Sequence, residues 1–395
     1  MSKASHIIQK NNTQKTAPSL KTIHRSKTHN TTSLPYISGQ KNPEHSQSLN
    51  HTLKGNIENF IGYTQVPLGI AGPLLINGDY ARGSYMIPLA TTEGALVASY
   101  SRGMKAAQLA GGIDTICVND QLQRVPYFEF ISAKAARDFG DWIKQQESKF
   151  QQLVSSTSNY CVYKSLSVIQ EGKGTLLNLS YTTADAAGQN MVTLATEAIC
   201  HYALSHSPIQ PTNWYIEANH SGDKKAQTMS LSQSRGKKII AEITLPKAIV
   251  KKILKSTPEA ICQYYLTATL CNLQTGAIGN VGHVANALTA IYLACGQDVA
   301  SVTESAIGIL RMETTKEGDL YASLTLPALV VGTVGGGTHL PTQAEALQLI
   351  DCSGAGKARK FAEICCATAL AGELSIAAAI AENHFTRAHK ILGRR

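Results

Sequence analysis

Glu93 interrupts apolar sequence in the segment Ala-Thr-Thr-Glu-Gly, directly before a periodic, alanine-rich segment. This periodicity predicts a helix over residues 96–109, with Thr91 and Thr92 as its cap and Gly111-Gly112 as its stop. An acid at a helix start interacts favourably with the helix dipole, so Glu93 could serve only as a capping residue. Alternatively, its surroundings could raise its pKa and make it a proton donor.

Two further breaks in apolar sequence carry charged residues. Asp223, Lys224 and Lys225 are consecutive on a polar loop. They could be a solvated charge run, or the lysine could polarise a carbonyl group and stabilise developing negative charge. Asp298 follows a predicted apolar helix over residues 284–295. Because the helix dipole disfavours an acid at a C-terminus, a functional role for Asp298 is as reasonable as a structural one.

Two glycine-containing segments could hold an anion or a cofactor. Residues 332–338 (Gly-Thr-Val-Gly-Gly-Gly-Thr) follow a predicted strand but match neither the dinucleotide fingerprint nor a Walker loop. They indicate only that the backbone closely approaches another group. Residues 185–191 precede a predicted helix, and a helix N-terminus beside a glycine is a natural anion site, although a turn and cap would look the same.

The histidines near the C-terminus do not predict a metal site. His384 and His389 are five residues apart and therefore do not share a helical face as an i, i+4 pair of ligands would. The sequence predicts no metal. A histidine in this position could act as a general acid.

The order of elements predicts an α+β protein in which a small domain is inserted into a large helix-rich one. Residues 127–216 have the βαββαβ order of the ferredoxin-like fold, with strands at 127–131, 161–169, 176–181 and 214–216 and helices at 133–153 and 191–204. Residues 56–126 and 217–395 form the large domain. Outside the insertion, strands are expected at 83–89, 239–245 and 320–334, and helices at 96–109, 246–254, from 258 onward, 284–295 and 358–381. Residues 61–74 read as a stretch punctuated by Gly and Pro.

The net charge of +9 is concentrated in residues 1–55, which hold eight Lys/Arg and a single acid. This polar segment predicts a disordered arm, either a solvated tail or a segment that contacts an acidic partner or a membrane surface. Because the rest of the chain is nearly neutral, the sequence argues against a nucleic-acid-binding protein.

Cysteine usage and hydropathy bear on the compartment. The nine cysteines form no Cys-x-x-Cys pair and have apolar neighbours, as expected of buried, reduced thiols in a cytoplasmic protein. Apolar runs such as residues 326–334 are far shorter than the roughly 20 residues of a membrane span, so no span is expected. The N-terminus lacks the apolar core of a secretory signal.

Taken together, these segments resemble the 3-hydroxy-3-methylglutaryl-coenzyme A (HMG-CoA) reductase family. The matching stretches run in the family's order from residue 58 to residue 389: ENFIGYTQVPLGIAGPL, ATTEGALVAS, DAAGQNM, DKK, ACGQD, GTVGGGT and LAGELS, followed by His389. The AGPL and GTVGGGT forms resemble the eukaryote-like and archaeal class. The resemblance implies a soluble protein with a small ferredoxin-like nucleotide-binding insertion. It also implies a homodimer or dimer of dimers whose active sites lie at the interface, without a catalytic metal.

The implied reaction is the reduction of HMG-CoA to mevalonate and free CoA with two NADPH, through a mevaldehyde hemithioacetal, with NADH as an alternative cofactor. By resemblance, Lys224 polarises the thioester carbonyl and stabilises the oxyanion. Glu93 supplies a proton to the aldehyde intermediate. Asp298 acts electrostatically on both Lys224 and Glu93, and His389 protonates the departing CoA thiolate.

The same resemblance implies two binding sets. The residues that match substrate-contacting positions are Arg124, Asp223, Lys225, His283 and Asn286. The residues that match cofactor-binding positions are Asp185, Gly188, Asn190, Met191, Gly332, Thr333, Gly335 and Gly336.

Several positions depart from the family pattern. Ala187 and Gln189 stand where methionine is usual, and Glu217 stands where a substrate-contacting serine is expected. A substrate-site lysine expected ahead of Gly276 is missing, and Asn159 stands where an arginine would approach the cofactor phosphate. These changes leave open an alternative: a diverged member that binds CoA thioesters with little or no reduction, or that reduces a different acyl-CoA.

Overall fold

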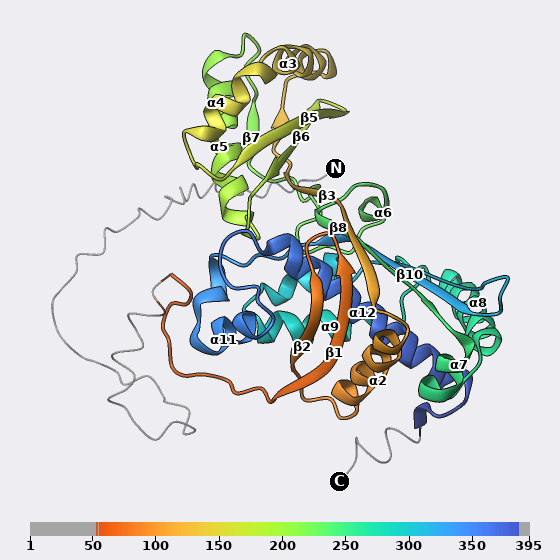
Figure 1. The fold of residues 1–395 in the computed structure, drawn as a ribbon. Coiled ribbons are helices and arrows are strands. Elements are labelled where there is room, and N and C mark those ends of the chain that lie inside the picture. The colour runs from red at the N-terminus through yellow and green to blue at the C-terminus, as the bar shows by residue number, and fades with distance from the viewer. Residues whose placement is uncertain (1–52, 54, 387–395) are drawn as a thin grey trace, which may run out of the picture.

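One long strand links two groups of strands in the computed structural model, which describes residue 53 and residues 55–386 (Figure 1). The first part of β3 (Ile113–Arg124) pairs in parallel with β1 (Leu68–Gly78) and antiparallel with β8 (Gly236–Leu245). Its last residues, 122–124, pair antiparallel with β6 (Gly174–Thr182). β3 therefore carries the chain from the larger group of strands into the smaller one.

The larger group has the strand order β2-β1-β3-β8-β10-β9, in which β2 is Arg82–Ala90, β9 is Ile309–Thr314 and β10 is Leu320–Leu329. Its core is formed with α2 (Leu96–Leu109), α9 (Val284–Ala294) and α12 (Ala358–Ala381). The close approach of α2 to α12 depends on Gly103, because a Cβ atom there would collide with the carbonyl group of Ala371.

The helix α12 is long and apolar enough to cross a membrane by length and composition alone. In the described part of the chain it is the one helix that meets this test, and most of it is buried by the surrounding elements. Burial on all sides explains the composition, because a central helix contacts apolar neighbours around its whole circumference.

The smaller group has the strand order β7-β4-β6-β5, with every neighbouring pair antiparallel. Its strands are β4 (Tyr127–Glu129), β5 (Val162–Glu171), β6 and β7 (Asn213–Tyr215), and its main helices are α3 (Ala133–Gln145), α4 (Phe150–Ser155) and α5 (Gln189–His206). A separate core rich in phenylalanine, including Phe128, Phe130 and Phe139, holds these elements together. The single helix predicted over 133–153 is interrupted by a short 3₁₀ turn, Glu147–Lys149.

The remaining elements are short connections and peripheral helices. They are α6 (Met229–Ser232), α7 (Lys247–Ile249), the π-helical turn Val250–Leu254, α8 (Pro258–Thr275), α10 (Val302–Ser305), α11 (Pro341–Leu349) and the 3₁₀ turns Val299–Ser301 and Gly336–His339. Thr257 caps α8 as the Thr-Pro sequence predicts, since its hydroxyl accepts the N–H of Ala260 at 3.2 Å.

The prediction of a mixed α+β protein is confirmed. The strands β1, β3 and β9 and the helix α11 were not predicted. In β3 polar residues interrupt the alternation of apolar and polar positions, and in β1 Gly and Pro interrupt it. The predicted cap of α2 is wrong: its N-cap is Ala95, and the Thr91 hydroxyl instead accepts the N–H of Glu93. All nine cysteines are free thiols, and six of them are buried. Apart from Leu53 and Gly55, the predicted basic arm lies outside the described residues.

Candidate active site

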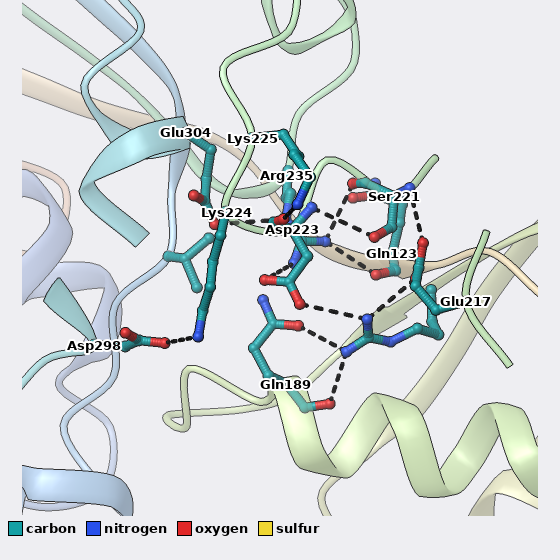
Figure 2. A network of polar contacts seen from close by, with 12 residues as sticks. Gln123, Gln189, Glu217, Ser221, Asp223, Lys224, Lys225, Arg235, Asp298 and Glu304 are labelled. Atoms are coloured by element: carbon teal, nitrogen blue, oxygen red, sulfur yellow. Dashed lines mark hydrogen bonds and ion pairs between the residues drawn. The ribbon is translucent and has the colours of Figure 1, made fainter. Parts of the chain in front are cut away.

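Lys224 lies on the loop between β7 and α6, and its ammonium group pairs with a carboxylate from a distant part of the chain. The Nζ atom is 3.0 Å from Oδ2 of Asp298 (Figure 2). This hydrogen bond is the main cause that raises the pKa of Lys224 above its usual value. The backbone of Lys224 is left-handed, with φ of 55°, a strained conformation for a lysine. Strain of this kind needs support from the surrounding structure.

Asp298 holds Lys224 while it also caps a short helix. The helix α9 ends at Ala294, so Asp298 is not at its C-terminus as the sequence suggested. Its Oδ1 atom accepts the N–H of Ala300 at 3.1 Å, at the start of the 3₁₀ turn Val299–Ser301. One carboxylate oxygen thus fixes the side chain and the other faces Lys224.

Arg124, at the end of β3, joins the loop to the smaller group of strands. Its Nη1 atom lies 3.1 Å from Glu217 and 3.4 Å from Asp223. Its Nη2 atom donates to the side-chain oxygen of Gln189, the first residue of α5, at 3.2 Å. Side chains from β3, from the loop after β7 and from the start of α5 therefore meet at this guanidinium.

Two buried charged residues that the sequence analysis missed, Arg235 and Glu304, pack against this loop. The Arg235 side chain is buried, and its Nη2 atom lies 3.2 Å from Oδ1 of Asp223. Glu304 is fully buried 3.8 Å from Arg235 Nε. Burial raises the pKa of Glu304 to about 7, although the nearby N–H groups of Lys224 and of Glu304 itself oppose this rise. A lone acid in the apolar stretch around residue 304 was the signal that could have found it.

A second group of predicted site residues gathers beside α2, α9 and α12. The Glu93 carboxylate accepts a hydrogen bond from Asn286 Nδ2 at 3.1 Å. His283 Nδ1 is 2.9 Å from the Tyr100 hydroxyl, and the Glu373 carboxylate accepts the N–H of His283 at 2.7 Å. Burial raises the pKa of Tyr100 well above its usual value.

Within the described residues, no hydrogen bond or ion pair joins this second group to Lys224 and Asp298. The predicted residues therefore form two groups in one chain. Lys225 is exposed. Among the described residues, its ammonium contacts only the backbone carbonyl of Asp223, in its own loop, at 3.2 Å.

Beside Asp298 lies a cavity of about 910 Å³. It is lined by the segment from Leu53 to Thr64, the start of α5, the end of α9 and the following loop, and residues 330–343. Gly332 anchors one wall, because its N–H donates to Gln297 Oε1 at 2.8 Å. Asn56 anchors another by donating to the carbonyl of Gly336 at 3.0 Å.

Six of the predicted cofactor-binding residues line this cavity: Gly188, Asn190, Met191, Gly332, Gly335 and Gly336. Asp185 and Thr333 lie outside the lining. Both oxygens of Asp185 accept backbone N–H groups before and at the start of α12, from Gly356 at 2.7 Å and Ala358 at 2.9 Å. Thr333 donates to the carbonyl of Gly354 at 2.6 Å. These two residues therefore connect the glycine-rich loop, residues 332–338, and the segment before α5 to the residues before and at the start of α12.

Two remaining predictions concern metals and the C-terminus. The described residues contain no group of three or more His, Cys, Asp or Glu side chains arranged to hold a metal ion. His389 lies outside the described residues, so its position relative to Lys224 stays a prediction.

The chain matches known proteins over most of its length. The family model for hydroxymethylglutaryl-coenzyme A reductase matches residues 21–394. The 3-hydroxy-3-methylglutaryl-coenzyme A reductases of Pyrococcus horikoshii and Methanocaldococcus jannaschii are 43% and 41% identical, over 87% of this chain and 85% of each relative. The reductase of the sea urchin Strongylocentrotus purpuratus is 37% identical over 84% of this chain, which spans 36% of that longer protein.

A solved structure shares the fold. The class II 3-hydroxy-3-methylglutaryl-CoA reductase from Streptococcus pneumoniae, bound to NADPH in open conformations, superposes with a TM-score of 0.67 at 19% identity. The match covers 86% of this chain and 93% of that one. From the family model and the archaeal relatives together, this chain belongs to the hydroxymethylglutaryl-coenzyme A reductase family.

Proposed function

We propose that this protein reduces HMG-CoA to mevalonate and free CoA. The observation that carries the proposal is the Lys224–Asp298 ion pair, 3.0 Å long, beside a glycine-walled cavity that can take a cofactor. The family membership and the names of the relatives support the same reaction.

The cavity suits a nicotinamide dinucleotide, and NADPH, which would supply hydride there, is the cofactor named for the Streptococcus structure. The start of the 18-residue helix α5, preceded by Gly188, offers backbone N–H groups to the cofactor diphosphate. Gly335 and Gly336 have positive φ angles and open space where a Cβ atom would stand, which lets the backbone approach a ligand closely.

The side chains of the predicted catalytic and substrate-binding residues suit the charge changes of the reaction. The Lys224 ammonium would polarise the thioester carbonyl and stabilise the oxyanion, and Asp298 keeps that ammonium charged and oriented. Arg124 would receive the carboxylate at the acyl end of the substrate. Glu93 would deliver a proton to the aldehyde intermediate, and His389 would protonate the CoA thiolate.

Within the described residues, no hydrogen bond or ion pair joins Glu93 to Lys224, which supports an active site at the interface of a homodimer. In such a dimer each site would combine the Lys224 group of one subunit with the Glu93 group of the other. A residue pair that acts together must lie within reach of one substrate.

Two further proposals concern the smaller group of strands and the compartment. We assign residues 127–216 to a ferredoxin-like cofactor domain, and the antiparallel order β7-β4-β6-β5, with α5 directed at the cavity, supports it. The nine free thiols are consistent with a reducing, cytoplasmic compartment.

The test is a turnover assay with purified protein and HMG-CoA, first with NADPH and then with NADH. Nicotinamide oxidation and release of free thiol are followed together. We expect about two cofactors oxidised per thiol released, because reducing a thioester to an alcohol takes two hydrides. Lys224→Ala should lower kcat at least ~10²- to 10³-fold, as expected for loss of an oxyanion-stabilising group.

Lys144→Ala is the matched control, because Lys144 also pairs with an aspartate, Asp141, but on the exposed face of α3. It should leave turnover unchanged. A folded wild-type protein that oxidises neither cofactor would refute the proposed reaction.

A further inference from the structure

The guanidinium of Arg124 is already neutralised before any substrate arrives. Only 9% of its side chain is exposed, and two carboxylates, Glu217 and Asp223, lie within 3.4 Å of its Nη1 atom. Its Nη2 atom is engaged by Gln189. A substrate carboxylate that approaches Arg124 therefore meets an occupied cation.

The two acids on Arg124 are not equivalent. Asp223 is shared with Arg235, which holds its other oxygen at 3.2 Å. Among the described residues, Arg124 is the sole cation paired with Glu217, at 3.1 Å. The other contacts of Glu217 are long ones to the N–H groups of Val125 and Ser221, both at 3.4 Å. Arg124 is thus the one cation among the described residues that lies against Glu217 and compensates its negative charge.

A third carboxylate at this position has two ways to bind, and both cost free energy. It can displace Glu217, which then loses its compensating cation while its side chain is only 20% exposed. Otherwise it lies beside Glu217, and like charges a few ångströms apart repel each other in a partly buried site. An uncharged acyl group incurs neither cost.

We propose that Glu217 is a specificity-determining residue that weakens the binding of acyl-CoA thioesters carrying a carboxylate at the acyl end, relative to uncharged ones. The proposal rests on the proposed function, because that function gives Arg124 its place at the acyl end. Discrimination by a built-in repulsive group is a common way to set specificity.

The test compares the dissociation constants of HMG-CoA and butyryl-CoA by calorimetry, without cofactor, for the full-length wild type, Glu217→Gln and Glu313→Gln. Glu217→Gln keeps the shape of the side chain and removes its charge. We expect HMG-CoA to bind this variant roughly tenfold more tightly, about 1.4 kcal/mol, with butyryl-CoA changed less than about twofold. Glu313, which pairs with Arg311 on the exposed strand β9, is the matched control and should change neither constant.

An unchanged ratio of the two constants, weaker binding of HMG-CoA by Glu217→Gln, or no HMG-CoA binding by any of the three proteins overturns the proposal. Weaker binding would mean that Glu217 only holds Arg124 in place. Thermal unfolding checks each variant, and Glu217→Ser replaces the glutamine variant if that variant does not fold. Binding is measured without turnover. A wild type that binds thioesters but does not reduce them therefore refutes the proposed reaction, while the ratio of the HMG-CoA and butyryl-CoA dissociation constants still tests the role of Glu217.

Discussion

At the scale of single residues, the chemistry of this site depends on which charges share a partner. Asp298 divides its two oxygens between a helix cap and Lys224, so the same carboxylate holds the backbone and raises the pKa of the lysine. Asp223 likewise divides its oxygens between Arg124 and Arg235. Asp298 and Asp223 are therefore each held by more than one contact, which restricts the position of each carboxylate.

Replacing Asp298 with asparagine tests the link between this carboxylate and Lys224. Because the hydrogen bond that Lys224 donates to Asp298 raises the pKa of Lys224, its loss lowers that pKa, and the lysine loses its proton at a lower pH. We expect a lower kcat and an alkaline limb of the kcat profile that moves to lower pH. Asp141→Asn, in the exposed pair with Lys144, should keep the wild-type profile. An alkaline limb that stays in place in Asp298→Asn would show that Lys224 does not determine it.

Glu304 predicts a dependence of stability on pH. Its pKa rises from 4.5 to about 7 in the folded protein, so the folded state binds the proton more tightly than the unfolded chain. The resulting stabilisation is full below pH 4.5 and is lost as pH rises through about 7. Glu304→Gln does not titrate, so its unfolding free energy relative to wild type should increase by up to roughly 3 kcal/mol between pH 4.5 and pH 8. Urea denaturation at both pH values measures this difference, and a constant difference would contradict the prediction.

At the scale of elements, helix α12 holds His283 of the second group and Asp185 near the glycine-rich loop. Glu373 on this helix holds the backbone of His283, and the residues just before and at its start bind Asp185 near the glycine-rich loop. The position of α12 in turn depends on its close contact with α2 at Gly103. Packing between α2 and α12 therefore helps to position the α12 residues that hold His283 and Asp185.

Gly103→Ala tests this packing. The added methyl group would collide with the Ala371 carbonyl, a rigid backbone group, so the helices must separate. We expect a loss of about 1–3 kcal/mol or more in unfolding free energy, measured by denaturant titration. Gly140→Ala in α3 is the matched control, because its methyl group would meet mainly a valine side chain that can adjust. An equal loss of unfolding free energy in the two variants would show that the α2–α12 contact at Gly103 is no more sensitive to an added methyl group than the surroundings of Gly140.

At the scale of the whole molecule, the proposed interfacial active site predicts complementation between inactive chains. If each site takes Lys224 from one subunit and Glu93 from the other, a mixed dimer of Lys224→Ala and Glu93→Gln chains contains one intact site. Refolding the two variants together in equal amounts should restore about a quarter of wild-type activity, since half of the dimers are mixed and each has one of two sites. Activity no higher than that of either variant alone would place both residues in the same subunit.

Local sequence patterns were sufficient to predict most helices, the strands with clean alternation and the loops that carry Lys224, Asp298 and the glycine-rich segment. The physical reason is that periodicity, caps and glycines act over a few residues and leave their mark in the neighbouring sequence. The same patterns missed β1 and β3, whose pairing overrides their glycine, proline and polar residues.

Tertiary structure decided which charges meet. Arg124 pairs with Glu217, 93 positions later in the chain, and Glu304 lies under a loop formed by residues about 80 positions before it. Neither contact leaves a periodic signal, because an ion pair requires only that two side chains lie close in space. Burial also raises the pKa of Glu304, and burial depends on the packing of the whole chain rather than on the residue type.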